Sequence, residues 1–213
     1  FARSSTARCS RMNVRIGDSA LPSVNGPQQY VSAQVKFDGQ TGPTIPERGL
    51  YLKADLRRFF QVPDVVTAGS ARAADPDRMT SGRLQLSLFT PVGRRGRMLL
   101  GGSGGSSFGD TTVVNAFALG GPFQLGAYYP GELRGSNALV ANLGYFHELA
   151  RFAEGTVGRL WFGSLLEHGS AFERMSSATF HTNVTAGFVL ESPIGPLFAG
   201  ASVGENGRYR VYF

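Results

Sequence analysis

The chain has 213 residues and a net charge of +6, with 42% hydrophobic residues but only 17% charged residues, against about a quarter in ordinary soluble domains. No apolar run reaches the roughly 20 residues of a membrane helix, so a place in a membrane would require a closed β-barrel. The basic residues are scattered rather than interleaved with aromatic residues, which argues against nucleic-acid binding. The single cysteine, Cys9, excludes an internal disulfide and a cysteine-based zinc site.

Apolar and polar residues alternate along most of the chain, which is typical of strands buried on one face. In RLQLSL, for example, three leucines alternate with Arg83, Gln85 and Ser87. The pattern predicts eight strands, of which the last divides in two at 204–207. Their ranges are 29–38, 49–60, 82–91, 96–107, 137–147, 156–168, 178–191 and 195–213. No segment has a convincing helical period, so the sequence predicts an all-β, antiparallel fold.

The connections between these strands differ in length in a regular way. Those at 61–82 and 106–136 are long, whereas those at 91–96 and 191–196 are tight turns. Long loops at one rim and short turns at the other are typical of outer-membrane barrels. A soluble β-barrel or sandwich that binds a small apolar ligand would show the same alternation, and it stays as an alternative.

The alternation also assigns two faces to each predicted strand. In a membrane barrel the polar face points to the lumen and the apolar face to lipid. The polar set includes Lys36, Lys53, Gln85, Asn183 and Thr185, and the apolar set includes Val35, Leu52, Leu86, Val184 and Phe188. At the end of the sequence, Tyr209, Val211 and Phe213 share one face. A last strand with aromatic residues on one face fits an interfacial girdle, so these three residues are a candidate C-terminal strand signal.

Four stretches, in order, resemble the barrel of the BamA-type bacterial surface-antigen superfamily. They are VKFDGQTGPTIPERG (35–49), FALGG (117–121), SLLEHGSAF (164–172) and ESPIGPLFAG (191–200). The assembly-factor branch has Arg-Gly and an aromatic residue in its long loop, where this chain has Gly126, Ala127 and Tyr128. The loop sequence GGPFQLGAYYPGELRG instead resembles the barrel of patatin-like phospholipases.

The resemblance implies an antiparallel transmembrane barrel of sixteen strands in the bacterial outer membrane. Residues 29–213 would be its C-terminal eight or nine strands, and residues 1–28 the remnant of a preceding strand and loop. Because nine strands are too few to close such a barrel, we expect an open, curved sheet with an unpaired first strand. The chain starts at Phe1, and the expectation is a fragment whose upstream lipase domain is absent.

By the same resemblance, this portion would be a non-catalytic translocator or anchor. The implied partners are outer-membrane lipid and lipopolysaccharide, the barrel assembly machinery and the upstream passenger domain, with no cofactor and no metal. An assembly or secretion pore of the same superfamily is the alternative, and a homodimer stays open.

The resemblance further implies that the long loop, about 106–136, folds into the barrel. The candidate loop anchors are Gly120, Gly121, Gly126, Tyr128, Arg134 and Glu167. A carboxylate in a partly dehydrated interior needs a cation or several hydrogen-bond donors. We therefore expect Glu167 to pair with Arg134, since the superfamily's usual arginine is missing, and Tyr128 to pack against strand 156–168.

One motif suggests catalysis. GGSGG at 101–105 matches the Gly-x-Ser-x-Gly nucleophile elbow, with Ser103 as the nucleophile. An elbow requires a strand before the serine and a helix after it, and the residues that follow have no helical stripe. A glycine-rich strand is favoured, and no catalytic residue is predicted. The three histidines, His147, His168 and His181, lack metal-ligand spacing.

Overall fold

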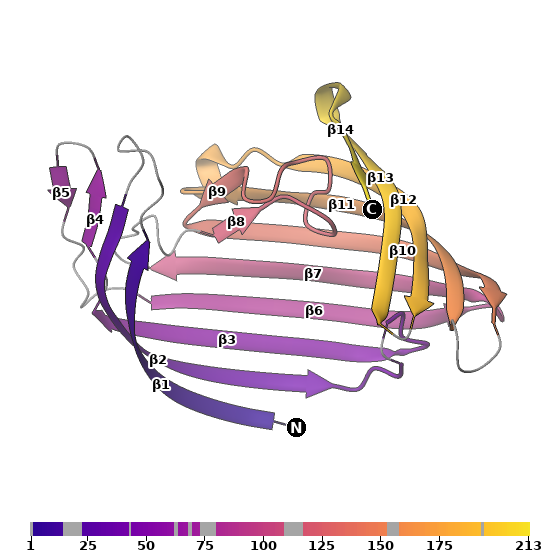
Figure 1. The fold of residues 1–213 in the computed structure, drawn as a ribbon, viewed down its shortest axis with the longest axis horizontal. Helices are drawn as coiled ribbons and strands as arrows, with labels where there is room; N and C mark the ends of the chain where they lie inside the picture. The colour runs from indigo at the N-terminus through magenta and orange to yellow at the C-terminus, as the bar shows by residue number, and fades with distance from the viewer. Residues whose placement is uncertain are drawn as a thin grey trace.

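A single curved sheet contains nearly all the regular structure in the computed structural model of the chain (Figure 1). The structure describes residues 2–14, 23–42, 44–61, 64–67, 70–72, 80–108, 117–152, 158–192 and 194–213. Within these ranges there are strands and two short 3-10 turns, η3 (Met175–Ser177) and η4 (Glu205–Gly207), but no α-helix. The prediction of an all-β, antiparallel fold is confirmed.

Twelve strands of the described residues belong to this sheet. From one edge they are β14 (Tyr209–Tyr212), β13 (Gly195–Gly204), β12 (His181–Ser192), β11 (Arg159–Phe172), β10 (Asn137–Arg151), β7 (Gly96–Phe108), β6 (Thr80–Val92), β3 (Gly49–Gln61), β2 (Ser23–Asp38), β4 (Asp64–Thr67) and β5 (Ser70–Arg72). β1 (Ala2–Val14) pairs with β2 along its whole length. β2 also pairs with β3 and, at its start, with β4.

The strands predicted from alternation are all present, with shifts of a few residues at their ends. Two short strands, β4 and β5, lie inside the connection predicted at 61–82. They hold four and three residues, too few to display an alternating pattern. Residues 1–28 contain β1 and the first part of β2.

The sheet does not close within the described residues. β14 pairs with β13 alone and β1 pairs with β2 alone, so each forms an edge. The expected open, curved sheet is therefore observed, but the strand expected to be first and unpaired, 29–38, lies within β2 and pairs with both β1 and β3. Because successive long strands are antiparallel neighbours, their connections alternate between two rims. At one rim, called the turn rim, β2 is followed by β3 and β6 by β7, and the adjoining ends of β10 and β11 and of β12 and β13 lie there. The opposite rim, called the loop rim, carries the hairpin at 117–135 and the connections at 173–180 and 205–208.

A small second sheet lies on one face of the large one. It consists of β8 (Phe117–Leu119) and β9 (Leu133–Gly135), and the loop between them contacts β11 to β14. Figure 1 shows the main sheet curling around it, so that β13 and β14 come round to its far side. The face that carries this loop is called the inner face, and the opposite one the outer face.

Two adjacent rows of side chains distinguish the faces. The outer row runs in register across seven strands and is entirely aliphatic. Its members are Leu50, Leu88, Leu100, Leu143, Leu166, Val184 and Val203. Their exposed fractions lie between 38% and 58%. The neighbouring inner row is Tyr51, Ser87, Gly101, Asn142, Glu167 and Asn183.

The predicted assignment of residues to faces agrees with these rows. Asn183 and Thr185 are buried on the inner face, while Leu86, Val184 and Phe188 are exposed on the outer face. The inner face therefore buries polar groups together with apolar clusters, whereas the outer face exposes an aliphatic row, which is unusual for a soluble sheet.

Candidate functional site

The loop at 117–135 forms a hairpin whose shape depends on left-handed backbone positions. Gly120 and Gly121, both predicted anchors, have φ angles of 120° and 97°. A Cβ on Gly120 would overlap the carbonyl oxygen of Tyr129 across the hairpin. Glycine is thus required at this position because only it combines a positive φ with so close an approach of the two chains.

A completely buried carboxylate holds the tip of this loop. Glu167 of β11 accepts hydrogen bonds from the backbone amides of Leu125 and Gly126, each at 3.0 Å. It accepts a third, also at 3.0 Å, from the hydroxyl of Thr185. Three donors on one carboxylate compensate for much of the water that it has lost. The Thr185 hydroxyl is 2.6 Å from that of Ser202, which extends the network to β13.

The loop lies so close to the sheet that Gly126 has no room for a side chain. A Cβ at this position would overlap the Ser202 hydroxyl and lie 2.9 Å from the Thr185 Oγ1 atom. The absence of a side chain therefore lets the Gly126 amide reach Glu167. The carbonyl of Gly126 accepts a hydrogen bond from the Tyr212 hydroxyl, so this one residue joins β11 to β14.

Two non-glycine residues of the loop are in the left-handed region. Phe123 and Leu125 have φ angles of 65° and 68°. Such backbone costs on the order of 1–2 kcal/mol per residue and persists only where its surroundings hold it. For Leu125 these surroundings are its hydrogen bond to Glu167 and complete burial in a cluster with Phe117 and Val140.

Tyr128 is buried, and its side-chain hydroxyl reaches β12. Its hydroxyl lies 2.8 Å from the His181 Nδ1 atom of β12, and the Arg208 guanidinium lies 4.6 Å from its ring centroid. The expected contact with the strand at 156–168 stays a prediction; Ala171, farther along the same strand, packs against the cluster that includes Tyr128. From β14, Arg210 donates to the Tyr128 carbonyl at 2.9 Å.

The expected ion pair between Arg134 and Glu167 is wrong. Arg134 donates through Nε to the Gly131 carbonyl of its own hairpin and is exposed. Arg134 follows the loop tip by eight residues, and the register of β8 with β9 places it at the base of the hairpin. Two arginines near the C-terminus contact the loop instead: Arg208 pairs with Glu132 at 2.6 Å, and Arg210 donates to the Tyr128 carbonyl.

A second segment folds onto the inner face at the turn rim. Ile45, in the connection between β2 and β3, is buried against Phe146, Trp161 and Val189. Ion pairs cover this cluster: Glu47 lies 3.5 Å from Arg159 and 4.0 Å from Arg97. These two arginines also lie within 6 Å of the Trp161 ring, at 5.6 and 5.8 Å.

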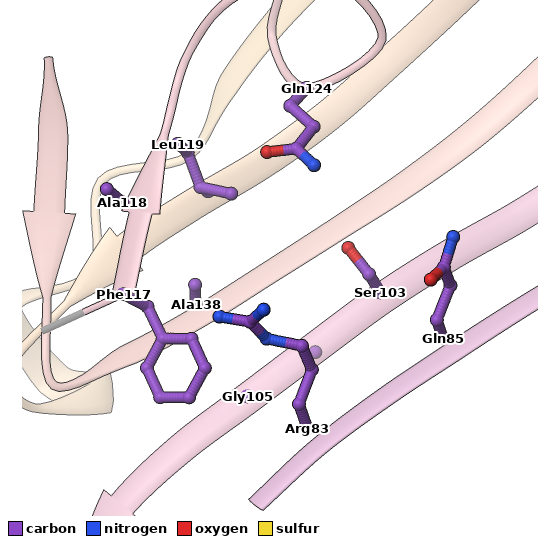
Figure 2. A pocket seen from close by; sticks show the side chains of 10 residues that line it. Arg83, Gln85, Ser103, Gly105, Phe117, Ala118, Leu119, Gln124 and Ala138 are labelled. Carbon is purple, nitrogen blue, oxygen red and sulfur yellow. The ribbon is translucent and has the colours of Figure 1, made fainter. Parts of the chain in front are cut away.

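Ser103 lies in the middle of β7, paired with Gln85 on one side and Val140 on the other. The strand–turn–helix geometry of a nucleophile elbow is not formed there. Ser103 lines a cavity of about 230 Å³ between the loop and the sheet (Figure 2). The cavity wall also includes Arg83 and Gln85 of β6, with Phe117 and Gln124 of the loop.

The C-terminal residues alternate as expected. Tyr209, Val211 and Phe213 are exposed, whereas Arg210 and Tyr212 turn toward the loop. The role of the first three as a strand signal stays a prediction. The region of the long connection at 109–116 lies outside the described residues.

Sequence reasoning did not single out Ser202, Arg208, Arg210 or Tyr212 as loop contacts. The sequence did show that Arg210 and Tyr212 share one face of the last strand, opposite Tyr209, Val211 and Phe213. Their partner could not be deduced, because it depends on the path of a loop distant in sequence.

No group of three or more His, Cys, Asp or Glu side chains in the described ranges is arranged to hold a metal ion. No helix there is long and apolar enough to cross a membrane. No protein-family model matches the chain, and no curated protein is significantly similar to it.

Proposed function

We propose that this chain forms part of the wall of a bacterial outer-membrane β-barrel and has no catalytic activity of its own. Its outer face would lie in lipid, and loop 117–135 would fill the interior beside Glu167. The observation that carries the proposal is the aliphatic row, seven exposed Leu and Val residues in register, set one residue away from a polar inner row.

The energetic cost of this row in water supports a lipid environment. Moving one Leu or Val side chain from water to an apolar medium is worth about 1.5–3 kcal/mol. Seven half-exposed members would therefore gain roughly 5–10 kcal/mol, which is comparable with the whole stability of an ordinary domain. A soluble sandwich would recover this energy with a second sheet, but the only other sheet in the described residues packs on the polar face.

Within outer-membrane barrels, the sequence resemblance favours the patatin-like branch of the surface-antigen superfamily. The docking of the loop tip through backbone amides supports that choice, because it does not use the arginine of the assembly-factor branch. The chain would then anchor an upstream passenger domain and contact lipopolysaccharide and the barrel assembly machinery. A docked loop in the interior favours an anchor over an open secretion pore.

A matched pair of substitutions tests the membrane assignment. Leu86 and Gln85 are adjacent, both exposed, and on opposite faces. In lipid vesicles, Leu86→Arg is expected to reduce folding stability by about 2–4 kcal/mol, as for arginine near a bilayer midplane. Gln85→Arg is expected to cost less than about 1 kcal/mol, since it faces the interior. Equal stabilities, or folding of the wild type as a monomer without detergent or lipid, would refute the proposal.

A further inference from the structure

We propose that the cavity between loop 117–135 and the strands β6 and β7 binds a small oxyanion, a free phosphate or carboxylate ion, with Arg83 as its charged ligand. This site goes beyond the proposed membrane role. Its described lining comes from the loop and the inner face of the sheet, so the site does not depend on the medium that covers the outer face.

The cavity is lined by unengaged hydrogen-bond donors. Gln85 and Ser103 point from the sheet toward the loop, and Gln124 points back from the loop (Figure 2). Within the described part of the chain, none of these three side chains has a hydrogen-bond partner. A volume of about 230 Å³ is ample for one hydrated oxyanion but too small for a large organic molecule.

Arg83 supplies the charge. Its guanidinium lies 5.2 Å from the Phe117 ring centroid, which holds it at the cavity edge. Among the described residues no carboxylate lies within ion-pair distance of it. The nearest candidate by register is Asp55, whose carboxylate is taken by Arg57 at 2.8 Å. Because the guanidinium is always charged and presents a planar fork, it suits a two-oxygen contact with phosphate or carboxylate.

Among the residues that the structure describes, the lining favours an anion over a cation. No described Asp or Glu belongs to it, and the polar side-chain groups of its described residues are one guanidinium, two amides and one hydroxyl. Amides and hydroxyls can donate to an oxyanion in the geometry that Figure 2 displays. Since Gln124 belongs to the loop and Arg83 to the sheet, a bound oxyanion would bridge the two and stabilise the docked loop.

The test is phosphate binding to the full chain folded in detergent micelles, by calorimetry, with chloride at the same ionic strength as the reference. We expect saturable binding by the wild type, and a loss of about tenfold or more in Arg83→Gln, since a charge-assisted hydrogen bond is removed. Arg134→Gln is the matched control, because it removes one charge from the same region without touching the cavity, and its affinity should be unchanged.

Ser103→Val keeps the net charge and suits a strand, but fills the cavity, and it should also weaken binding. If Arg83→Gln does not fold, Ser103→Val alone tests whether the cavity binds phosphate. Equal affinity in wild type, Arg83→Gln and Ser103→Val would overturn the proposal, as would absence of saturable binding by the wild type. Neither result would affect the Leu86 and Gln85 comparison, so the two proposals fail independently.

Discussion

Loop 117–135 and segment 39–48 both fold onto the inner face of the sheet, from opposite rims, but different chemistry holds them. The loop tip is fixed by polar contacts, with Glu167 accepting from two backbone amides. The segment at the turn rim is fixed by an apolar side chain, Ile45, under ion pairs that the exposed Glu47 makes with two less exposed arginines. Hydrogen bonds require a fixed geometry, so the loop's attachment tolerates few substitutions. The segment's attachment depends on the apolar area that Ile45 buries, and neighbouring side chains can repack around a different residue.

The largest effect is expected from Glu167→Ala. It leaves two buried amides and the Thr185 hydroxyl without their acceptor, at about 1–3 kcal/mol for each unsatisfied group. We expect the free energy of unfolding to fall by about 3 kcal/mol or more. The released loop should also be cleaved by trypsin at Arg134, and mass spectrometry would detect the fragments. Glu132→Ala, in the same loop but exposed, is the control. If Arg134 resists protease in both Glu167→Ala and Glu132→Ala, Glu167 does not hold the loop.

The next effect is expected from Ile45→Ala. Truncating a buried isoleucine costs about 2–5 kcal/mol, and the lower end applies because a surface segment can settle into the gap. Chemical unfolding of the variant should show this loss while Arg134 stays protected from protease, because the two attachments are at opposite rims. Release of the loop by Ile45→Ala would show that the two regions are coupled.

Gly126→Ala should cost about 1–3 kcal/mol, as overpacking does. The added methyl would meet the hydroxyls of Ser202 and Thr185. Gly126→Ala combined with Ser202→Gly should recover part of the loss, since the second change removes the closest contact. If the double variant is no more stable than Gly126→Ala, the contact with Ser202 is not the cause of the destabilisation.

The smallest effect concerns Glu132 and Arg208, an exposed pair worth less than about 1 kcal/mol. The Tyr129 amide, followed by the Arg208 guanidinium, lowers the pKa of Glu132 below its ordinary value of 4.5. A lowered pKa means that the stabilisation is complete above pH 4.5 and disappears as the pH falls through the value in the folded state. Protease release of the loop should thus rise below pH 4.5 slightly more in the wild type than in Glu132→Gln, where only the Glu132 contribution is missing.

Sequence reasoning located the strands because alternation is a local signal, and it assigned Val184 and Thr185 to the correct faces for the same reason. It singled out Glu167 and Gly126 through the resemblance, but gave Glu167 the wrong partner. A sequence shows which residues are charged. Backbone amides occur at almost every residue, so the sequence does not show which of them lie close to the Glu167 carboxylate. The burial of Ile45 was missed because one apolar residue in a polar connection has no periodicity.

The most direct test of the central claim, that the outer face lies in lipid, uses spin labels on adjacent residues of β6. Cysteines replace Leu84 or Gln85 in a Cys9→Ser background, which removes the only native thiol. In vesicles, the label at 84 should be relaxed mainly by oxygen, which concentrates in lipid, and the label at 85 mainly by a water-soluble nickel complex. Equal access of the nickel complex to both labels would contradict the account, because it would place both faces of the strand in water.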